Sequence, residues 1–291
     1  MRNYFKSAKK VKDYSRDSEK AIQELNLDWK VTKENLFTTK EKVKNHYATV
    51  RNDTFETLGI VGNRYTPIQN KNAFSFVDAL IGTGNGEIIN GGTFDGGSKV
   101  YLTVKLPKGI VIGDNDNIDT YLQIFNSHDG TSSLNIQLLG LRQICSNGLV
   151  GFTGLSNFKI RHSLHSALNL NLAKSKLGII YNQMEELEKI GNKLAKIPIH
   201  NGIASEYFMK VFNYDSEKLT TRQKNVLYLL SDHYQNGEGS NLKTSKDTLW
   251  GAYQSVIEYL DHGQKGEKEK SNNFGSGYQT KVRALEVALE V

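Results

Sequence analysis

The sequence predicts an α+β fold, and two observations predict it. The middle of the chain is rich in short segments in which apolar and polar residues alternate, as in strands, whereas the last third carries apolar residues at helical spacing. Strands and helices are thus separated along the chain, which argues against a doubly wound sheet. We expect a central antiparallel, strand-rich core with an inserted helix, followed by a helical C-terminal third.

Three regions follow from this division. We expect a basic flexible arm over residues 1–17, an α+β core domain over 18–166 and a helical region over 167–291 packed on the core. Residues 1–16 hold six basic side chains against one acidic one, with three aromatic residues interleaved. This arm is either a solvated, frayed terminus or a segment that follows phosphates while its aromatic rings stack on bases.

The core is predicted to begin with a helix over residues 18–29, which Ser18 is placed to cap. A second helix, the inserted one, is expected over 69–80, after a turn containing Pro67, which a first helical turn tolerates. Short runs rich in β-branched and aromatic residues predict strands between these helices, over 30–32, 36–38, 47–50 and 55–60.

The clearest local signal is a hairpin. Residues 87–94 and 99–106 alternate like strands, and Asp95-Gly96-Gly97 separates them. Alternation along the second strand places Val100, Leu102, Val104 and Leu106 on one face and Lys99, Tyr101, Thr103 and Lys105 on the other. The second face is either a solvated sheet face or a surface that meets a phosphate backbone.

The remaining elements follow the same rules. A short strand is expected over 110–112, and residues 158–165 either alternate as a strand or lead into a helix. Apolar residues at helical spacing predict four more helices, over 169–196, 221–234, 246–262 and 278–291.

Most of the unusual residue choices gather in Tyr121–Phe152, which joins two strand-like runs. Its bend at His128-Asp129-Gly130 can present amides, hydroxyls and a histidine to an anion, or Asp129 can simply cap its own turn. Arg142 lies in an apolar run and needs a partner, for which we expect Asp129 or an external phosphate. Cys145 follows an apolar strand and is expected to be a buried packing residue.

Several kinds of site are excluded by their spacing. The glycines of residues 82–86 follow a helix, whereas a dinucleotide loop follows a strand, and residues 114–117 lack the glutamate of a calcium loop. His162 and His165 have no third ligand close in sequence. We therefore predict no catalytic residues, no metal and no cofactor, and we lean against an enzyme. One cysteine, no secretory signal and no membrane-length apolar run favour the cytoplasm.

The sequence also resembles a known family. The runs Asn126–Gly130 and Arg142–Leu149 are similar to those of a phage- and plasmid-encoded family described only as a domain of unknown function (DUF932-type). Further matching pieces are Leu27–Val31, Leu58–Asn70, Thr248–Tyr253, Asp261-His262, Phe274-Gly275 and Lys281. The resemblance implies a mobile-element origin but no activity. Asn147-Gly148 departs from the family's usual Asn-Thr pair, so no role of that hydroxyl carries over.

The order of elements over residues 67–165 is distantly similar to that of single-strand annealing proteins of the Rad52 type. Our first hypothesis is therefore a protein that binds single-stranded nucleic acid, as an annealing or recombination factor and a homo-oligomer. The expected contacts are Arg64, Lys99, Tyr101, Lys105, His128 and Arg142. The alternatives are an interaction protein that inhibits a host defence complex and an enzyme that uses His128 and Asp129 on a phosphate-containing substrate.

Overall fold

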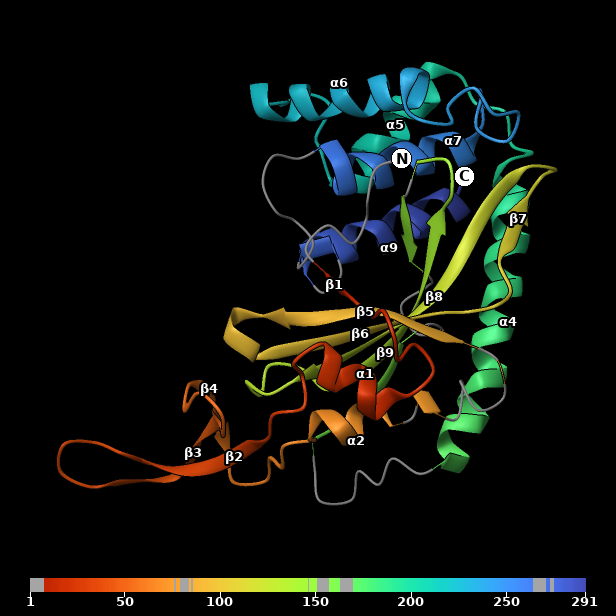
Figure 1. The fold of residues 1–291 in the computed structure, drawn as a ribbon. Coiled ribbons are helices and arrows are strands. Elements are labelled where there is room, and N and C mark those ends of the chain that lie inside the picture. The colour runs from red at the N-terminus through yellow and green to blue at the C-terminus, as the bar shows by residue number, and fades with distance from the viewer. Residues whose placement is uncertain are drawn as a thin grey trace.

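The computed structural model describes residues 8–75, 77–78, 84, 86–145, 147–150, 157–162, 170–263, 271–272 and 275–291. Antiparallel sheets occupy the N-terminal two-thirds and helices follow, which confirms the predicted α+β class. Figure 1 shows the large sheet in the middle, with α1 (Ser18–Glu24) and α2 (Asn70–Phe74) on one side, α5 (Asn201–Phe212), α6 (Thr221–Asn236), α7 (Leu249–Glu258) and α9 (Ser276–Leu289) on the other, and α4 (Leu170–Leu194) running alongside. Among the described residues, no helix has the length and apolar character needed to cross a membrane.

The larger sheet has the strand order β1-β5-β6-β8-β9-β10, with β7 paired to β8 and β11 paired to β9. Its strands are β1 (Lys9–Lys10), β5 (Glu87–Phe94), β6 (Lys99–Lys105), β7 (Ile110–Ile112), β8 (Asp116–Ser127), β9 (Leu134–Arg142), β10 (Gly148–Val150) and β11 (Asn157–Ile160). The predicted hairpin is confirmed as β5 and β6, joined by a 3-10 turn, η1 (Asp95–Gly97). Lys9 and Lys10, in the segment expected to be an arm, pair with β5 at the sheet edge.

A second sheet contains β2 (Val31–Phe37), β3 (Lys42–Arg51) and β4 (Thr57–Gly62) in that order. The two short strands expected over 30–32 and 36–38 are one continuous strand, β2. Residues 33–35 are polar and gave no strand signal in the sequence. They are nevertheless extended and pair with β3. Figure 1 shows the end of the β2–β3 hairpin extending away from the rest of the molecule.

The helices are α1 (Ser18–Glu24), α2 (Asn70–Phe74), α4 (Leu170–Leu194), α5 (Asn201–Phe212), α6 (Thr221–Asn236), α7 (Leu249–Glu258), the π-helical turn η2 (Tyr259–Gly263) and α9 (Ser276–Leu289). Helix α1 is capped by Asp17, whose side chain accepts from the Lys20 amide, and not by Ser18 as expected. Ser18 is instead buried and bonds to Asp78. Helix α5 was not predicted.

Alternation along the strands gives the large sheet two buried faces. Val100, Leu102 and Val104 of β6 belong to the main apolar core, together with residues of α1 and α2. The opposite face carries a smaller cluster in which Tyr121, Leu139 and Leu141 pack against Tyr278 and Val282 of α9. The face that was expected to be solvated or to meet phosphate is therefore largely covered, and Tyr101 is only 4% exposed.

Candidate functional site

Residues 121–142 lie largely in β8 and β9, which are neighbours inside the large sheet and pair along most of their length. The arginine of this stretch, Arg142, is 1% exposed and has a partner that sequence reasoning did not name. The guanidinium donates from Nε to Oδ1 of Asp116 at 2.6 Å and from Nη2 to Oδ2 at 2.7 Å. Our expectation that Asp129 or a phosphate would neutralise Arg142 was wrong, because Asp116 at the start of β8 does so.

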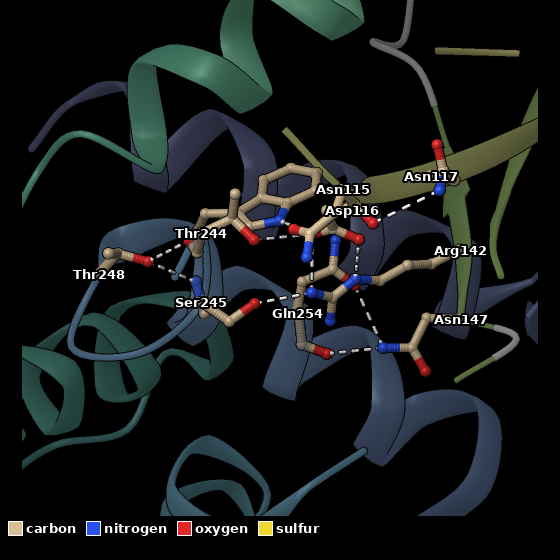
Figure 2. Close-up of polar contacts among 11 residues, drawn as sticks. Asn115, Asp116, Asn117, Arg142, Asn147, Thr244, Ser245, Thr248 and Gln254 are labelled. Carbon is tan, nitrogen blue, oxygen red and sulfur yellow. Dashed lines mark hydrogen bonds and ion pairs between the residues drawn. The ribbon is translucent and has the colours of Figure 1, made fainter. Parts of the chain in front are cut away.

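Three further side chains complete this buried centre, and all come from the helical third of the chain (Figure 2). Ser245 accepts from Arg142 at 2.7 Å, while Thr244 and the Trp250 indole donate to Asp116 at 3.1 and 2.9 Å. Burial lowers the pKa of Arg142, but the hydrogen bonds and charge of Asp116 outweigh it, so the net pKa is raised. The centre thus joins the sheet to the helices through a buried ion pair and its hydrogen bonds.

The turn after β9 is attached to the same helices. Asn147 is fully buried and donates from Nδ2 to the main-chain and side-chain oxygens of Gln254, both at 3.2 Å. Cys145 is buried as predicted, and burial raises the pKa of its thiol to about 11. A thiol with that pKa is protonated at neutral pH, so Cys145 is a packing residue and a poor nucleophile.

A second buried ion pair joins α9 to this region. Lys281 is fully buried and donates from Nζ to Oδ1 and Oδ2 of Asp261 at 2.6 and 2.8 Å and to the Gly148 carbonyl at 2.9 Å. Asp261 also accepts from the Gly148 amide at 2.8 Å and from Asn272 at 3.1 Å. Sequence reasoning noted Lys281 and Asp261 only as parts of a resemblance and assigned them no contact.

His128 occupies a third buried centre, on the side of the sheet where α2 lies. Its Nε2 lies 2.9 Å from Oδ1 of Asn70, and its ring packs edge-on against Trp29 with centroids 5.3 Å apart. Burial, with a smaller contribution from His162, lowers the pKa of His128 to about 3. His128 is therefore neutral near physiological pH and buried, which opposes both roles that the sequence left open, contact with an anion and action with Asp129 on a phosphate-containing substrate.

Asp129 turns away from His128 and caps its own turn, one of the two readings that the sequence left open. It accepts from the Thr131 amide at 2.9 Å and from Nζ of Lys99 at 2.8 Å. Burial raises the pKa of Asp129, but the hydrogen bonds from Lys99, Ser127 and Thr131 outweigh it and hold the pKa well below its ordinary value. Gly130 has φ of +76°, so glycine is needed for this bend.

Acid should destabilise the protein through His128 and His162. Burial lowers their pKa values to about 3 and about 4, whereas both are near 6.5 in an unfolded chain. The unfolded state therefore binds protons that the folded state does not, so stability is full above about pH 6.5 and is lost as the pH falls toward 4. We expect the free energy of unfolding, measured with urea, to fall by a few kcal/mol over this range, since each unit of pKa shift corresponds to about 1.4 kcal/mol.

The matched variant carries His128→Gln and His162→Gln. It should be less stable at neutral pH, yet its stability should change much less between about pH 6.5 and about 5.5, a window about one pH unit above the ordinary carboxylate pKa values. If the free energy of unfolding fell equally with pH in the variant and the wild type, these histidines would not be the cause of the acid sensitivity.

The structure does not gather the six predicted contact residues on one surface. Arg64 and Lys105 are exposed, and Lys105 lies 3.4 Å from Asp119. Lys99 is mostly buried in its ion pair with Asp129. The other three, Tyr101, His128 and Arg142, are buried, and Tyr101 stacks on Phe94 and lies beside Phe125. In this conformation these three side chains do not face an external ligand.

A group of exposed lysines lies on the β2–β3 hairpin. Lys40, Lys42 and Lys44 are all exposed around its turn, and Phe37 beside them is 69% exposed. Sequence reasoning missed these residues, although the alternating run Lys40-Glu41-Lys42-Val43-Lys44 was a visible signal. Among the described residues, no group of three His, Cys, Asp or Glu side chains is arranged to hold a metal ion.

Comparison with known proteins identifies one likeness. A family model described as "Domain of unknown function (DUF932)" matches residues 57–286. No curated protein matches the chain, and no solved structure matches it either. The match includes β8, β9 and all the helices from α4 to α7, and thus both buried ion pairs.

Proposed function

The chain belongs to the DUF932 family, a domain of unknown function, and we propose that this member binds single-stranded nucleic acid through its basic N-terminal part. One observation carries the proposal, the uneven distribution of charge. Residues 1–50 contain twelve Lys or Arg against seven Asp or Glu, so they hold five of the six excess positive charges of the chain. Clustered positive charge attracts nucleic acid because phosphates release condensed counterions when basic side chains replace them.

The exposure of these basic residues supports the same proposal. Within residues 1–50, Lys30, Lys40, Lys42 and Lys44 are exposed, as is Arg64 beyond them, and none of these side chains makes an ion pair with another described residue. Exposed lysines without acidic partners are available to phosphates. Exposed aromatic rings in this part of the chain, at Phe37 and Phe55, add flat surfaces on which unpaired bases can stack.

Equilibrium binding to labelled DNA tests the proposal. We expect fluorescence anisotropy to detect binding to a single-stranded oligonucleotide at low salt, with affinity that falls steeply as salt rises. A duplex of the same sequence and the polyanion heparin serve as controls, and single-stranded DNA should bind more tightly than the duplex. Absence of binding at low salt would overturn the proposal.

Annealing and self-assembly are the finer parts of the proposed role. Mass photometry with and without single-stranded DNA reports both assembly and binding, and a complementary-strand assay reports annealing. An annealing factor should form oligomers on DNA and accelerate pairing of complementary strands. A protein that binds DNA as a monomer and leaves the pairing rate unchanged would be a binding protein without annealing activity.

A further inference from the structure

The β2–β3 hairpin is longer than the sheet that supports it. Strand β4 pairs with β3 only between His46 and Val50, whereas β2 and β3 continue to the pair Phe37–Lys42. Among the described strands, none therefore pairs with the end of the hairpin, residues 36–45, as a third strand. Figure 1 shows this end directed away from the body of the molecule. We call residues 36–45 the hairpin tip.

The base of the hairpin is firmly attached. Thr49 donates to the His128 carbonyl at 2.7 Å, and Gly59 of β4 lies so close to Asp129 that a Cβ there would be 2.5 Å from its Cα. Arg51 lies 4.3 Å over the Trp29 ring and forms an ion pair with Asp53 at 2.7 Å. These contacts fix the direction in which the tip projects.

Basic residues at the base and at the tip of the hairpin differ in the contacts that their side chains make. At the base, Lys33 donates to the carbonyls of Asn63 and Tyr65 at 2.7 and 3.0 Å and lies over the ring of Tyr47. The ammonium group of Lys33 is thus already in contact with other groups of the fold. The tip lysines make no ion pair with any described residue, so their charge remains available to a partner.

The tip nevertheless has a defined turn. The Thr38 amide donates to the Glu41 carbonyl at 2.8 Å, and the Thr38 hydroxyl accepts from the Lys40 and Glu41 amides. Phe37 pairs with Lys42 across the hairpin next to this turn. A single exposed phenylalanine is ordinary, but here it lies among three free lysines at the end of a projecting, anchored hairpin.

We propose that the hairpin tip is the nucleic-acid-contacting arm, in which Lys40, Lys42 and Lys44 follow phosphates and Phe37 stacks on a base. This inference rests on the proposed function and names the surface that performs it. Charge complementarity selects the partner: residues 40–44 hold three lysines against one glutamate, Glu41, and this excess of positive charge attracts a phosphate backbone. The stacking ring favours a single strand, whose bases are open.

The central test is a triple variant with Lys40→Gln, Lys42→Gln and Lys44→Gln. Each lost phosphate contact lowers the slope of log affinity against log salt by about 0.7, so the slope should fall by about 2. We expect at least a tenfold loss of affinity for single-stranded DNA at low salt. The matched control replaces three exposed lysines at the C-terminal end of α4 and just beyond it, Lys189, Lys193 and Lys196, by glutamine and should bind within about twofold of the wild type.

A second variant, Phe37→Ser, separates stacking from charge. It should lose about tenfold in affinity for single-stranded DNA while its salt slope stays unchanged, because it removes a stacking surface and no charge. Both tip variants should unfold at the wild-type urea midpoint, since the substituted side chains are exposed.

The outcomes separate the two proposals. If the wild type fails to bind DNA, the proposed function fails. If the wild type binds DNA and the tip variant loses no more affinity than the α4 control, the hairpin tip is not the contact surface, although the proposed function still holds. Vesicles containing phosphatidylserine are the last probe. If the protein binds them through the tip and does not bind DNA, the tip is a membrane-binding element and the proposal of a nucleic-acid contact is wrong.

Discussion

Replacing Arg142 by methionine should destabilise the protein by about 3–5 kcal/mol, because it leaves the Asp116 carboxylate buried without its cation. The pair is almost fully excluded from water, with side-chain exposures of 1% and 0%. Thr244 and Trp250 would still donate to Asp116, but two neutral donors do not replace a bidentate guanidinium. Urea unfolding followed by tryptophan fluorescence measures the effect, since Trp250 reports directly on this centre.

The matched control is Lys105→Met. Lys105 also forms an ion pair with an aspartate, but both side chains are partly exposed, and such pairs contribute about 0–1 kcal/mol. The conservative variant Arg142→Lys should fall between the two, because an ammonium keeps the charge but not the planar pair of hydrogen bonds. Equal unfolding midpoints for Arg142→Met and Lys105→Met would contradict a structural role for the buried pair.

This centre also shows where sequence reasoning ended. An arginine in an apolar run correctly indicated a buried charge that needed a partner. Its partners, Asp116 and Ser245, lie 26 and 103 residues away, and local patterns carry no information about pairings of that range. Residues 114–117 were considered only as a calcium loop, and excluding that loop left the Asp116 carboxylate without a role.

The elements themselves were predicted where one period dominates. Alternation of apolar and polar residues predicted the β5–β6 hairpin, and apolar residues at helical spacing predicted α4, α6, α7 and α9. Both periods arise because one face of each element is buried. Helix α5 was missed although its signal was present, since Ala204, Tyr207, Phe208 and Val211 are buried at helical spacing. Alternation also predicted correctly which residues share a face with Tyr101, but not that this face would be covered.

Six residues in or beside the matching pieces share a structural role. Arg142, Asn147 and Gly148 come from the sheet, and Trp250, Asp261 and Lys281 come from the helical third. All six take part in the buried polar contacts that join the two parts. In this chain these six residues therefore help to join the sheet to the helices.

Replacing Lys281 by methionine should have an effect as large as that at Arg142, about 3–5 kcal/mol, because Asp261 would remain buried without a cation. Burial lowers the pKa of Lys281, and the charge of Asp261 opposes that effect. Lys71→Met is the matched control, since Lys71 pairs with Glu19 on the surface with side-chain exposures of 63% and 56%. The same substitution there should cost less than about 1 kcal/mol.

Hydrogen exchange distinguishes a local effect of Lys281→Met from a global one. Lys281 ties α9 to β10 through the Gly148 carbonyl and to η2 through Asp261, so its loss removes the polar contacts at that junction. Amides of α9 and η2 should therefore exchange faster than in the wild type at urea concentrations well below the unfolding midpoint, while amides of β5 and β6 remain protected. Uniform acceleration across the sheet would mean that α9 unfolds only together with the core, and unchanged exchange in α9 would show that apolar packing of Tyr278 and Val282 holds this helix without the ion pair.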